Sequence, residues 1–112
     1  MEIAADLRYL DPQHLAVGGK GCEGMTVRNQ SGIIGKFQGF LVDPVARRLR
    51  FVVIELLGRL RLMPVTTARI DVIQGAIELL DHGDIRFSKP FQRELFRTLS
   101  DESSILAKRS LA

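Results

Sequence analysis

The sequence is poor in the residues that build disulfide bonds and metal centres. Its 112 residues include one cysteine, Cys22, and two histidines, His14 and His82, which lie far apart in the chain. A single cysteine excludes an intrachain disulfide, and a thiolate metal cluster needs more sulfur ligands than one such chain offers. We therefore expect no metal site and no cofactor held by cysteine or histidine.

Long hydrophobic runs are also lacking. The uncharged apolar run Phe51–Ile54 is far shorter than the roughly 20 residues that a membrane-spanning helix needs. The first ten residues begin acidic and contain neither the basic nor the apolar region of a signal peptide. We expect a cytoplasmic protein without a transmembrane segment.

Stacking aromatic residues are few as well, because tryptophan is absent and aromatics make up 6% of the chain. The net charge is +3, and the basic excess lies in residues 25–80, which hold eight basic and four acidic side chains. These are mostly separate arginines along predicted strands. Nucleic-acid surfaces usually combine clustered Lys and Arg with stacking aromatics, so the composition favours a solvated basic face over a nucleic-acid interface.

What the chain does contain is typical of one folded domain, with 46% hydrophobic and 26% charged residues. Its organisation divides into a lead-in with a glycine-rich linker (1–23), a β-rich segment (24–80) and a C-terminal extension (81–112). The linker has a formal G-x-G-x-x-G motif at Gly19, Gly21 and Gly24. A dinucleotide site requires a helix after the motif, but β-type residues follow, so we interpret the motif as a flexible connection.

Short β-type runs separated by turn residues fill the segment 24–80. They predict six strands, at 25–28, 33–42, 49–56, 59–63, 68–73 and 76–80. Turns every 8–12 residues indicate a mainly β fold, a small six-stranded antiparallel β-barrel. Gly35 and Gly39 interrupt the second strand and predict a bulge or a sharp coil there.

Alternation along these strands predicts which side chains are buried. Leu60 and Leu62 are expected to face inward and Arg59 and Arg61 outward, while the run 51–54 suggests burial on both faces of its strand. In the strand 68–73, Ile70 and Val72 are expected to face inward, with Arg69 and Asp71 outward. The predicted core comprises Val27, Ile34, Phe37, Leu41, Phe51, Val53, Leu60, Leu62, Ile70, Val72 and Ile77.

The extension after residue 80 is predicted to be partly helical. A polar break with Asp81, His82 and Asp84 has loop composition, although two carboxylates and a histidine also suit a metal. A helix is expected to begin at Ser88 or Lys89 and to present Phe91, Leu95 and Leu99 as one apolar stripe. A second short helix is expected after Ser100.

Several short motifs in the β-rich segment resemble the PRC-barrel domain family in their order and spacing. They are GMTV, GIIGK, FLVD, RLRFVVI and LMPV, at Gly24–Val27, Gly32–Lys36, Phe40–Asp43, Arg48–Ile54 and Leu62–Val65. The resemblance covers about half of the chain and implies a compact six-stranded barrel, here as a stand-alone bacterial member. The family includes the cytoplasmic part of the photosynthetic reaction-centre H subunit and the C-terminal domain of a ribosome maturation factor. It implies a protein-interaction module and supplies no catalytic residues.

Three functions follow as hypotheses. The first is a non-enzymatic interaction or assembly module, with self-association as one form of it. Its acidic protein partner would bind a basic face comprising Arg47, Arg48, Arg50, Arg59 and Arg61, unless that face only keeps the protein soluble. The second is an RNA- or ribosome-associated module that uses the same arginines. The third is an enzyme built on Cys22 or on the 81–84 break; we expect none, because no catalytic grouping is visible.

Overall fold

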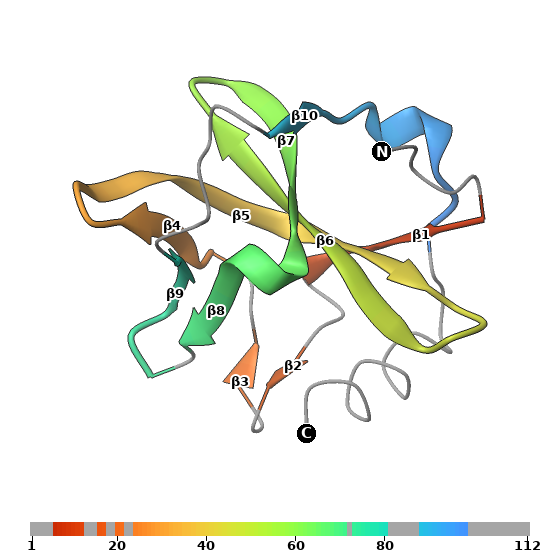
Figure 1. The fold of residues 1–112 in the computed structure, drawn as a ribbon, viewed down its shortest axis with the longest axis horizontal. Helices are drawn as coiled ribbons and strands as arrows, with labels where there is room; N and C mark the ends of the chain where they lie inside the picture. Colours follow the sequence, from red (N-terminus) through yellow and green to blue (C-terminus); the bar gives the residue numbers. More distant parts are fainter. Residues whose placement is uncertain are drawn as a thin grey trace.

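The computed structural model describes residues 6–12, 16–17, 20–21, 24–71, 73–80 and 88–98. The fold is mainly β (Figure 1). All six predicted strands are present, within one or two residues of their expected ends. They are β4 (Thr26–Asn29), β5 (Gly32–Asp43), β6 (Arg48–Leu56), β7 (Arg59–Pro64), β8 (Ala68–Asp71) and β9 (Ala76–Leu79).

Further strands come from both sides of this segment. β1 (Arg8–Leu10) pairs with β5, and β10 (Lys89–Pro90) pairs with β7. The glycine-rich stretch, predicted to be only a connection, contains a small ladder between β2 (Ala16–Val17) and β3 (Lys20–Gly21). A strand rather than a helix follows its last glycine, as expected.

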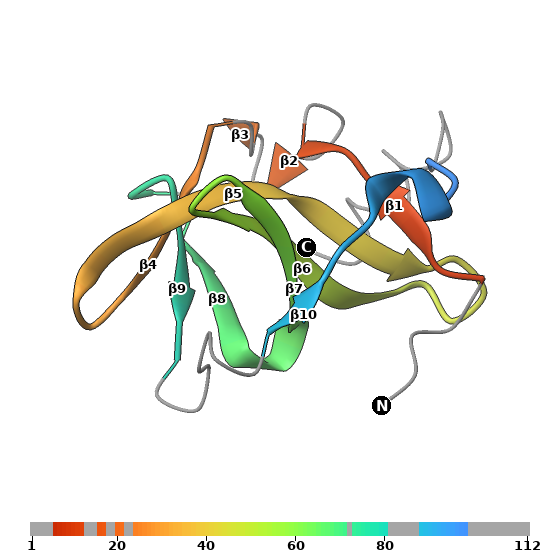
Figure 2. The ribbon, with the colours of Figure 1, turned by 90° about the horizontal axis from the view of Figure 1, so that it is seen from above.

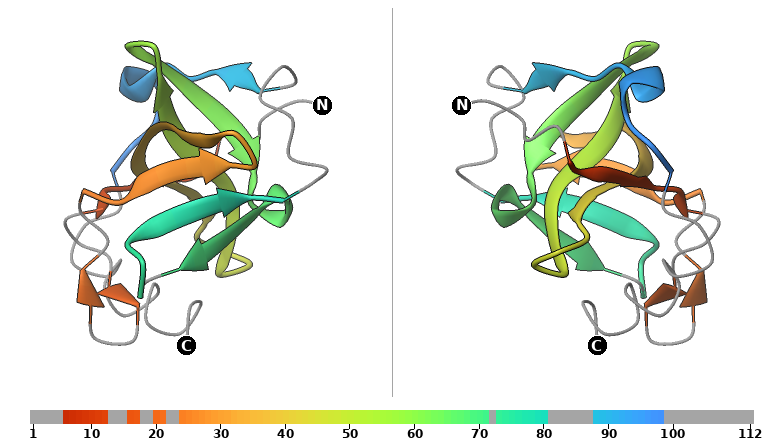
Figure 3. Two further views of the ribbon diagram at one scale, coloured as in Figure 1. Left: turned by 90° about the vertical axis from the view of Figure 1, so that its left-hand side faces the viewer. Right: turned by 90° about the vertical axis from the view of Figure 1, so that its right-hand side faces the viewer.

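The sheet differs from the predicted antiparallel barrel in pairing and in closure. Its order is β10-β7-β6-β5-β4-β9-β8, with β1 beside β5. β4 and β9 are parallel, so the sheet is mixed. The sheet curls strongly (Figure 3), but no pairing among the described strands joins its two ends, and the barrel is not closed. Local turn signals predict hairpins only, whereas here the β8–β9 hairpin attaches as a unit to β4.

Bulges in β5 confirm the disruption expected near its glycines. Val27 opposes Gly35 while Arg28 opposes Ile33, which leaves Ile34 without a partner in β4. Gln38 is likewise the extra residue between the pairs that β5 makes with β6. Each bulge moves the following side chains to the other face of the strand. Phe37 and Phe40 therefore lie on one face, with ring centroids 4.9 Å apart.

Two apolar clusters lie on opposite faces of the β5–β6 hairpin. The first lies inside the curl of the sheet and comprises Leu10, Met25, Val27, Phe37, Phe40, Val42, Val52, Ile54, Met63, Ile77 and Leu79. The second lies on the outer face and comprises Leu7, Tyr9, Leu41, Phe51, Val53, Leu62 and Phe91. The run 51–54 is buried throughout and alternates between the clusters, which confirms the predicted burial on both faces.

Most of the predicted core is buried, but it is divided between these clusters. Ile34, Leu60 and Ile70 are only partly buried, and Val72 lies outside the described residues. The predicted orientation of β7 is wrong. Leu62 packs in the outer cluster, whereas Arg61 opposes Ile54, a member of the inner one. A period of two separates the faces of a strand but does not say which face meets the main core.

Segments from both sides of the β-rich region cover the outer cluster. β1 lies along β5, and the segment that contains β10 lies beside it (Figure 2). The Tyr9 N–H donates to the Arg97 carbonyl at 2.8 Å, and the Tyr9 ring stacks on Phe91. The two edge segments are therefore bonded to each other as well as to the sheet.

The predicted helix after Ser88 is wrong. Lys89 and Pro90 form β10, and the only helical turn among residues 88–98 is the 3₁₀ turn η4 (Arg93–Leu95). Phe91 is buried but Leu95 is largely exposed, so they do not form one stripe; Leu99 and the second predicted helix lie outside the described residues. β7 offers an unpaired edge, and pairing with it satisfies backbone groups that a short helix would leave open. In the described part of the chain, no helix is long and apolar enough to cross a membrane.

Candidate interaction surface

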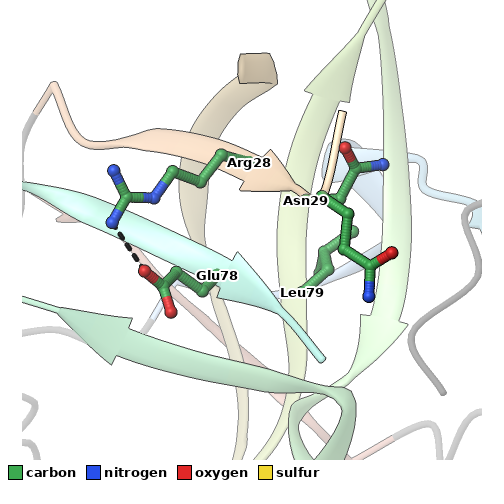
Figure 4. Close-up of a pocket in the computed structure, with 5 residues that line it drawn as sticks. Arg28, Asn29, Glu78 and Leu79 are labelled. Carbon is green, nitrogen blue, oxygen red and sulfur yellow. Dashed lines mark hydrogen bonds and ion pairs between the residues drawn. The ribbon is translucent and has the colours of Figure 1, made fainter. Parts of the chain in front are cut away.

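An ordered row of charged side chains crosses the outward face of β4, β9 and β8. Arg28 opposes Glu78 in the parallel pairing, and Glu78 opposes Arg69 in the β8–β9 hairpin. The Arg28 Nη2 donates to Glu78 Oε1 at 2.5 Å (Figure 4), and Arg69 Nη2 donates to Glu78 Oε2. One carboxylate thus bridges two guanidinium groups across three strands.

The turn after β8 extends this row into a network. The Arg28 guanidinium also donates to the Gln74 side chain and lies 4.0 Å from an Asp71 carboxylate oxygen. The other Asp71 oxygen accepts a hydrogen bond from the Gln74 N–H at 3.1 Å. We call Arg28, Arg69, Asp71, Gln74 and Glu78 the charged face. Its two guanidinium and two carboxylate groups balance, so it presents fixed charges without a net charge.

The electrostatics of Glu78 follow from these contacts. The hydrogen bond from Arg28, followed by the one from Arg69, lowers the pKa of the Glu78 carboxyl below its ordinary value. Glu78 therefore stays ionised at neutral pH. Arg28 and Arg69 therefore remain paired with a charged carboxylate at that pH, and the charged face keeps its pattern of charges.

Exposed apolar side chains flank the charged face. Ile33 opposes Arg28 from β5 and is 71% exposed, and Ile73 follows β8 and is 86% exposed. A cavity of about 230 Å³ adjoins the row and is lined by Arg28, Asn29, Gln30, Glu78 and Leu79 (Figure 4). Small-molecule sites usually have about 300–1,000 Å³. The cavity is smaller than that range.

β8, which carries Arg69 and Asp71 of the charged face, forms one end of the sheet. Among the described strands it pairs with β9 alone. The Leu80 N–H donates to the Thr67 carbonyl at 2.9 Å, so Thr67 points its carbonyl toward β9. The backbone N–H and C=O groups of successive residues in a strand point to opposite sides. Those of Arg69 and Asp71 therefore also point toward β9, whereas those of Ala68 and Ile70 point away from it. The Ala68 N–H agrees with this, since it bonds to Val65 in the 3₁₀ turn η2 (Val65–Thr67).

A second cavity, of about 350 Å³, lies beside β1. It is lined by Tyr9, Asp11, Pro12, Gly24, Lys36, Phe37 and Gln38. The Tyr9 hydroxyl donates to the Gln38 carbonyl in the β5 bulge, and the Arg93 guanidinium lies 4.2 Å from the centre of its ring. Burial, and then the Asp11 charge, raise the pKa of Tyr9. These contacts anchor β1 and β10 to the sheet.

The structure does not bring the five predicted arginines together. Arg47, Arg48 and Arg50 lie at the β5–β6 turn, where Arg50 is 4.0 Å from Asp43. Arg59 lies at the opposite end of β6, which has nine residues and is about 26 Å long. The Arg61 Nε donates to the Ser88 hydroxyl at 2.9 Å and holds the segment that contains β10. The basic residues thus form two separate groups.

Sequence reasoning found part of the charged face and missed its centre. Alternation placed Arg69 and Asp71 on the outside, and the same rule applies to Arg28 and Glu78 in their strands. Alternation does not reveal that β4 pairs with β9, which places Arg28 beside Glu78, 50 positions later in the chain. No local pattern signals that contact.

The remaining chemical candidates lie outside the described residues: Cys22, His14, Asp81, His82 and Asp84. Within the described ranges, no three His, Cys, Asp or Glu side chains are grouped so as to hold a metal ion. No protein-family model matches the chain, and no curated protein matches it in sequence.

Replacing Glu78 with glutamine should reduce the loss of stability in acid. The folded state lowers the Glu78 pKa, so the unfolded state binds the proton first as the pH falls. The stability that Glu78 contributes is present above its ordinary pKa of about 4.3 and is lost as the pH falls through the lower folded value. Urea unfolding of both proteins across this range measures the difference. Curves that stay parallel at all pH values would contradict the role given to Glu78.

Proposed function

We propose that the protein is a non-enzymatic module that binds a protein partner through the outer face of β4, β9 and β8. The observation that carries the proposal is the charged face together with the open edge of β8. Charges held in fixed positions confer specificity on an interface, because a mismatched partner leaves them unpaired. An open edge strand offers backbone donors and acceptors to an added strand.

The flanking isoleucines add to this argument. Ile33, opposite Arg28, and Ile73, next to Gln74 in the turn after β8, are large apolar side chains in water. Their burial by a partner would contribute roughly 1.5–3 kcal/mol each. The combination of apolar contacts, fixed charges and an open edge fits a protein partner better than a small molecule.

We also propose that the chain is a stand-alone relative of the PRC-barrel family. The motifs that carry the resemblance lie on β4 to β7, in the order the family has them. In that family six strands close a barrel, whereas the sheet here is open and has additional strands at its edges. The support comes from these consecutive strands, and it favours an interaction role over catalysis.

One observation favours the alternative, an RNA- or ribosome-associated module. Arg47, Arg48 and Arg50 lie close together at the β5–β6 turn, beside Val45, which is 84% exposed. A basic hairpin end of this kind suits contact with phosphates. It is a smaller basic site than the face of five arginines that the sequence suggested.

Affinity capture with the full chain as bait tests the proposal. We expect a protein to be retained from lysate of the source cells, to survive nuclease treatment, and to be lost with Arg69→Glu. Arg59→Glu is the matched control, since it makes the same charge change on β7, which carries none of the residues of the charged face, and it should retain the partner. A partner released by nuclease would favour the RNA alternative. Equal capture by both variants, or no capture at all, would overturn the proposed surface.

A further inference from the structure

The open edge of β8 has a defined hydrogen-bonding capacity. Ile70 directs both its N–H and its carbonyl away from β9, and Ala68 directs its carbonyl the same way, by the alternation established above. The Ala68 N–H already donates a hydrogen bond to the Val65 carbonyl. Ile70 is therefore the residue that can exchange two backbone bonds with an added strand.

The side chains on either side of Ile70 carry opposite charges. Arg69 precedes it and Asp71 follows it, and both lie on the charged face. If two copies of β8 run antiparallel with Ile70 opposite Ile70, each Arg69 opposes an Asp71 of the other copy. A shift by one residue in either direction would lose this match and would also place backbone groups that face β9 at the seam.

We propose that β8 pairs with β8 of a second copy of this chain, antiparallel and centred on Ile70, to form a two-fold dimer. This inference rests on the proposed function and names the partner of the same edge. The two Ile70 residues form a hydrogen-bonded pair across the axis. Arg69 and Asp71 then occupy non-hydrogen-bonded positions, where opposing Cα atoms approach to about 4.5 Å and side chains interact most closely.

The existing contacts prepare these side chains for the dimer. Glu78 holds the Arg69 guanidinium on the outer face, yet the side chain remains 63% exposed. Asp71 is held by the Gln74 N–H and by the nearby Arg28. Side chains that are already ordered lose less conformational entropy on association. The seam is short, so we expect a dimer that dissociates in the micromolar range or above.

Paired charge reversals test both the interface and its register. The variant Arg69→Asp presents two carboxylates at the edge, and the variant Asp71→Arg presents two guanidinium groups. Because the opposing charges are then alike, two molecules of the same variant should repel each other, and the dimer dissociation constant should rise at least about tenfold. An equimolar mixture should restore the dimer as a heterodimer, because every opposing pair is again of opposite charge. Analytical ultracentrifugation of the full chain over a range of concentrations measures the masses.

Two further variants separate the edge from general effects of charge and folding. Ile70→Pro removes an outward N–H that makes no bond to β9, and it also shortens a side chain that packs against the inner cluster. The protein should be less stable but still folded, while the dimer is lost. Arg59→Asp makes the same charge change on β7 rather than on the β8 edge and should leave the dimer intact. Melting curves verify that each variant is folded. If a charge variant is unfolded, the proline variant decides.

The outcomes are distinct. A wild-type chain that is monomeric at every concentration overturns the inference, as does a dimer that survives Ile70→Pro or a mixture of reversed variants that stays monomeric. The wild-type chain, whose edge is intact, used as bait, separates this failure from that of the proposed function. Capture of another protein by a chain that never dimerises would retain the module and reject the dimer, while no capture and no dimer would reject both.

Discussion

Replacing Phe40 with alanine is expected to lower the free energy of unfolding by about 3–5 kcal/mol. Phe40 is fully buried in the inner cluster and makes an edge-to-face contact with Phe37. The loss combines the transfer energy of the ring with the cavity it leaves. β5 pairs with β4, β6 and β1, so its backbone has little freedom to collapse into that space. Denaturant unfolding monitored by circular dichroism gives the difference.

Two comparisons make this result specific. Val45→Ala, in the exposed β5–β6 turn, should change stability by no more than about 0.5 kcal/mol. Phe51→Ala truncates the outer cluster and should cost as much as Phe40→Ala, since both clusters share the β5–β6 hairpin. If Phe51→Ala produced a separate early transition while Phe40→Ala shifted the main one, the clusters would not form one cooperative unit.

The second large effect is expected from Gly39→Ala, with a loss of about 2–5 kcal/mol. Gly39 has a φ of +121°, which side chains rarely adopt. A Cβ there would lie 2.5 Å from the Leu10 carbonyl oxygen and 2.9 Å from the Tyr9 ring. The backbone strain therefore adds to a clash that pushes β1 away from β5. Denaturant unfolding measures the total, and the fluorescence of Tyr9, the only tyrosine in the chain, reports on β1.

Gly58→Ala provides the matched control. Gly58 also has a positive φ, +78°, but a Cβ there would meet nothing within 4 Å. Gly58→Ala should lower the free energy of unfolding only by the backbone strain of the positive φ, about 1–2 kcal/mol, and should leave the Tyr9 fluorescence unchanged. An equal loss for both variants would show that the close approach of β1 to Gly39 contributes nothing to stability.

The candidate site shows how far local patterns reach. Alternation correctly placed Arg69 and Asp71 outside, yet the same rule gave the wrong orientation for Leu60, Leu62 and Arg61. β7 is covered on both sides by segments distant in the chain, so either face can hold apolar residues. The five arginines are similarly divided, because adjacency in the sequence across the β6–β7 turn does not place Arg59 near Arg48.

Sequence alone determined where the six central strands lie, where β5 is interrupted, and that the run 51–54 is buried on both faces. These features depend on residues close to one another in the chain, through side-chain periodicity, turn chemistry and the conformations open to glycine. Tertiary structure decided the parallel pairing of β4 with β9, the open rather than closed sheet, the use of residues 89–90 as a strand, and the meeting of Arg28 with Glu78. Each of these depends on contacts between distant segments. Their free energy comes from burial and pairing that exist only after the chain has closed long loops, and no local pattern encodes which loop will close.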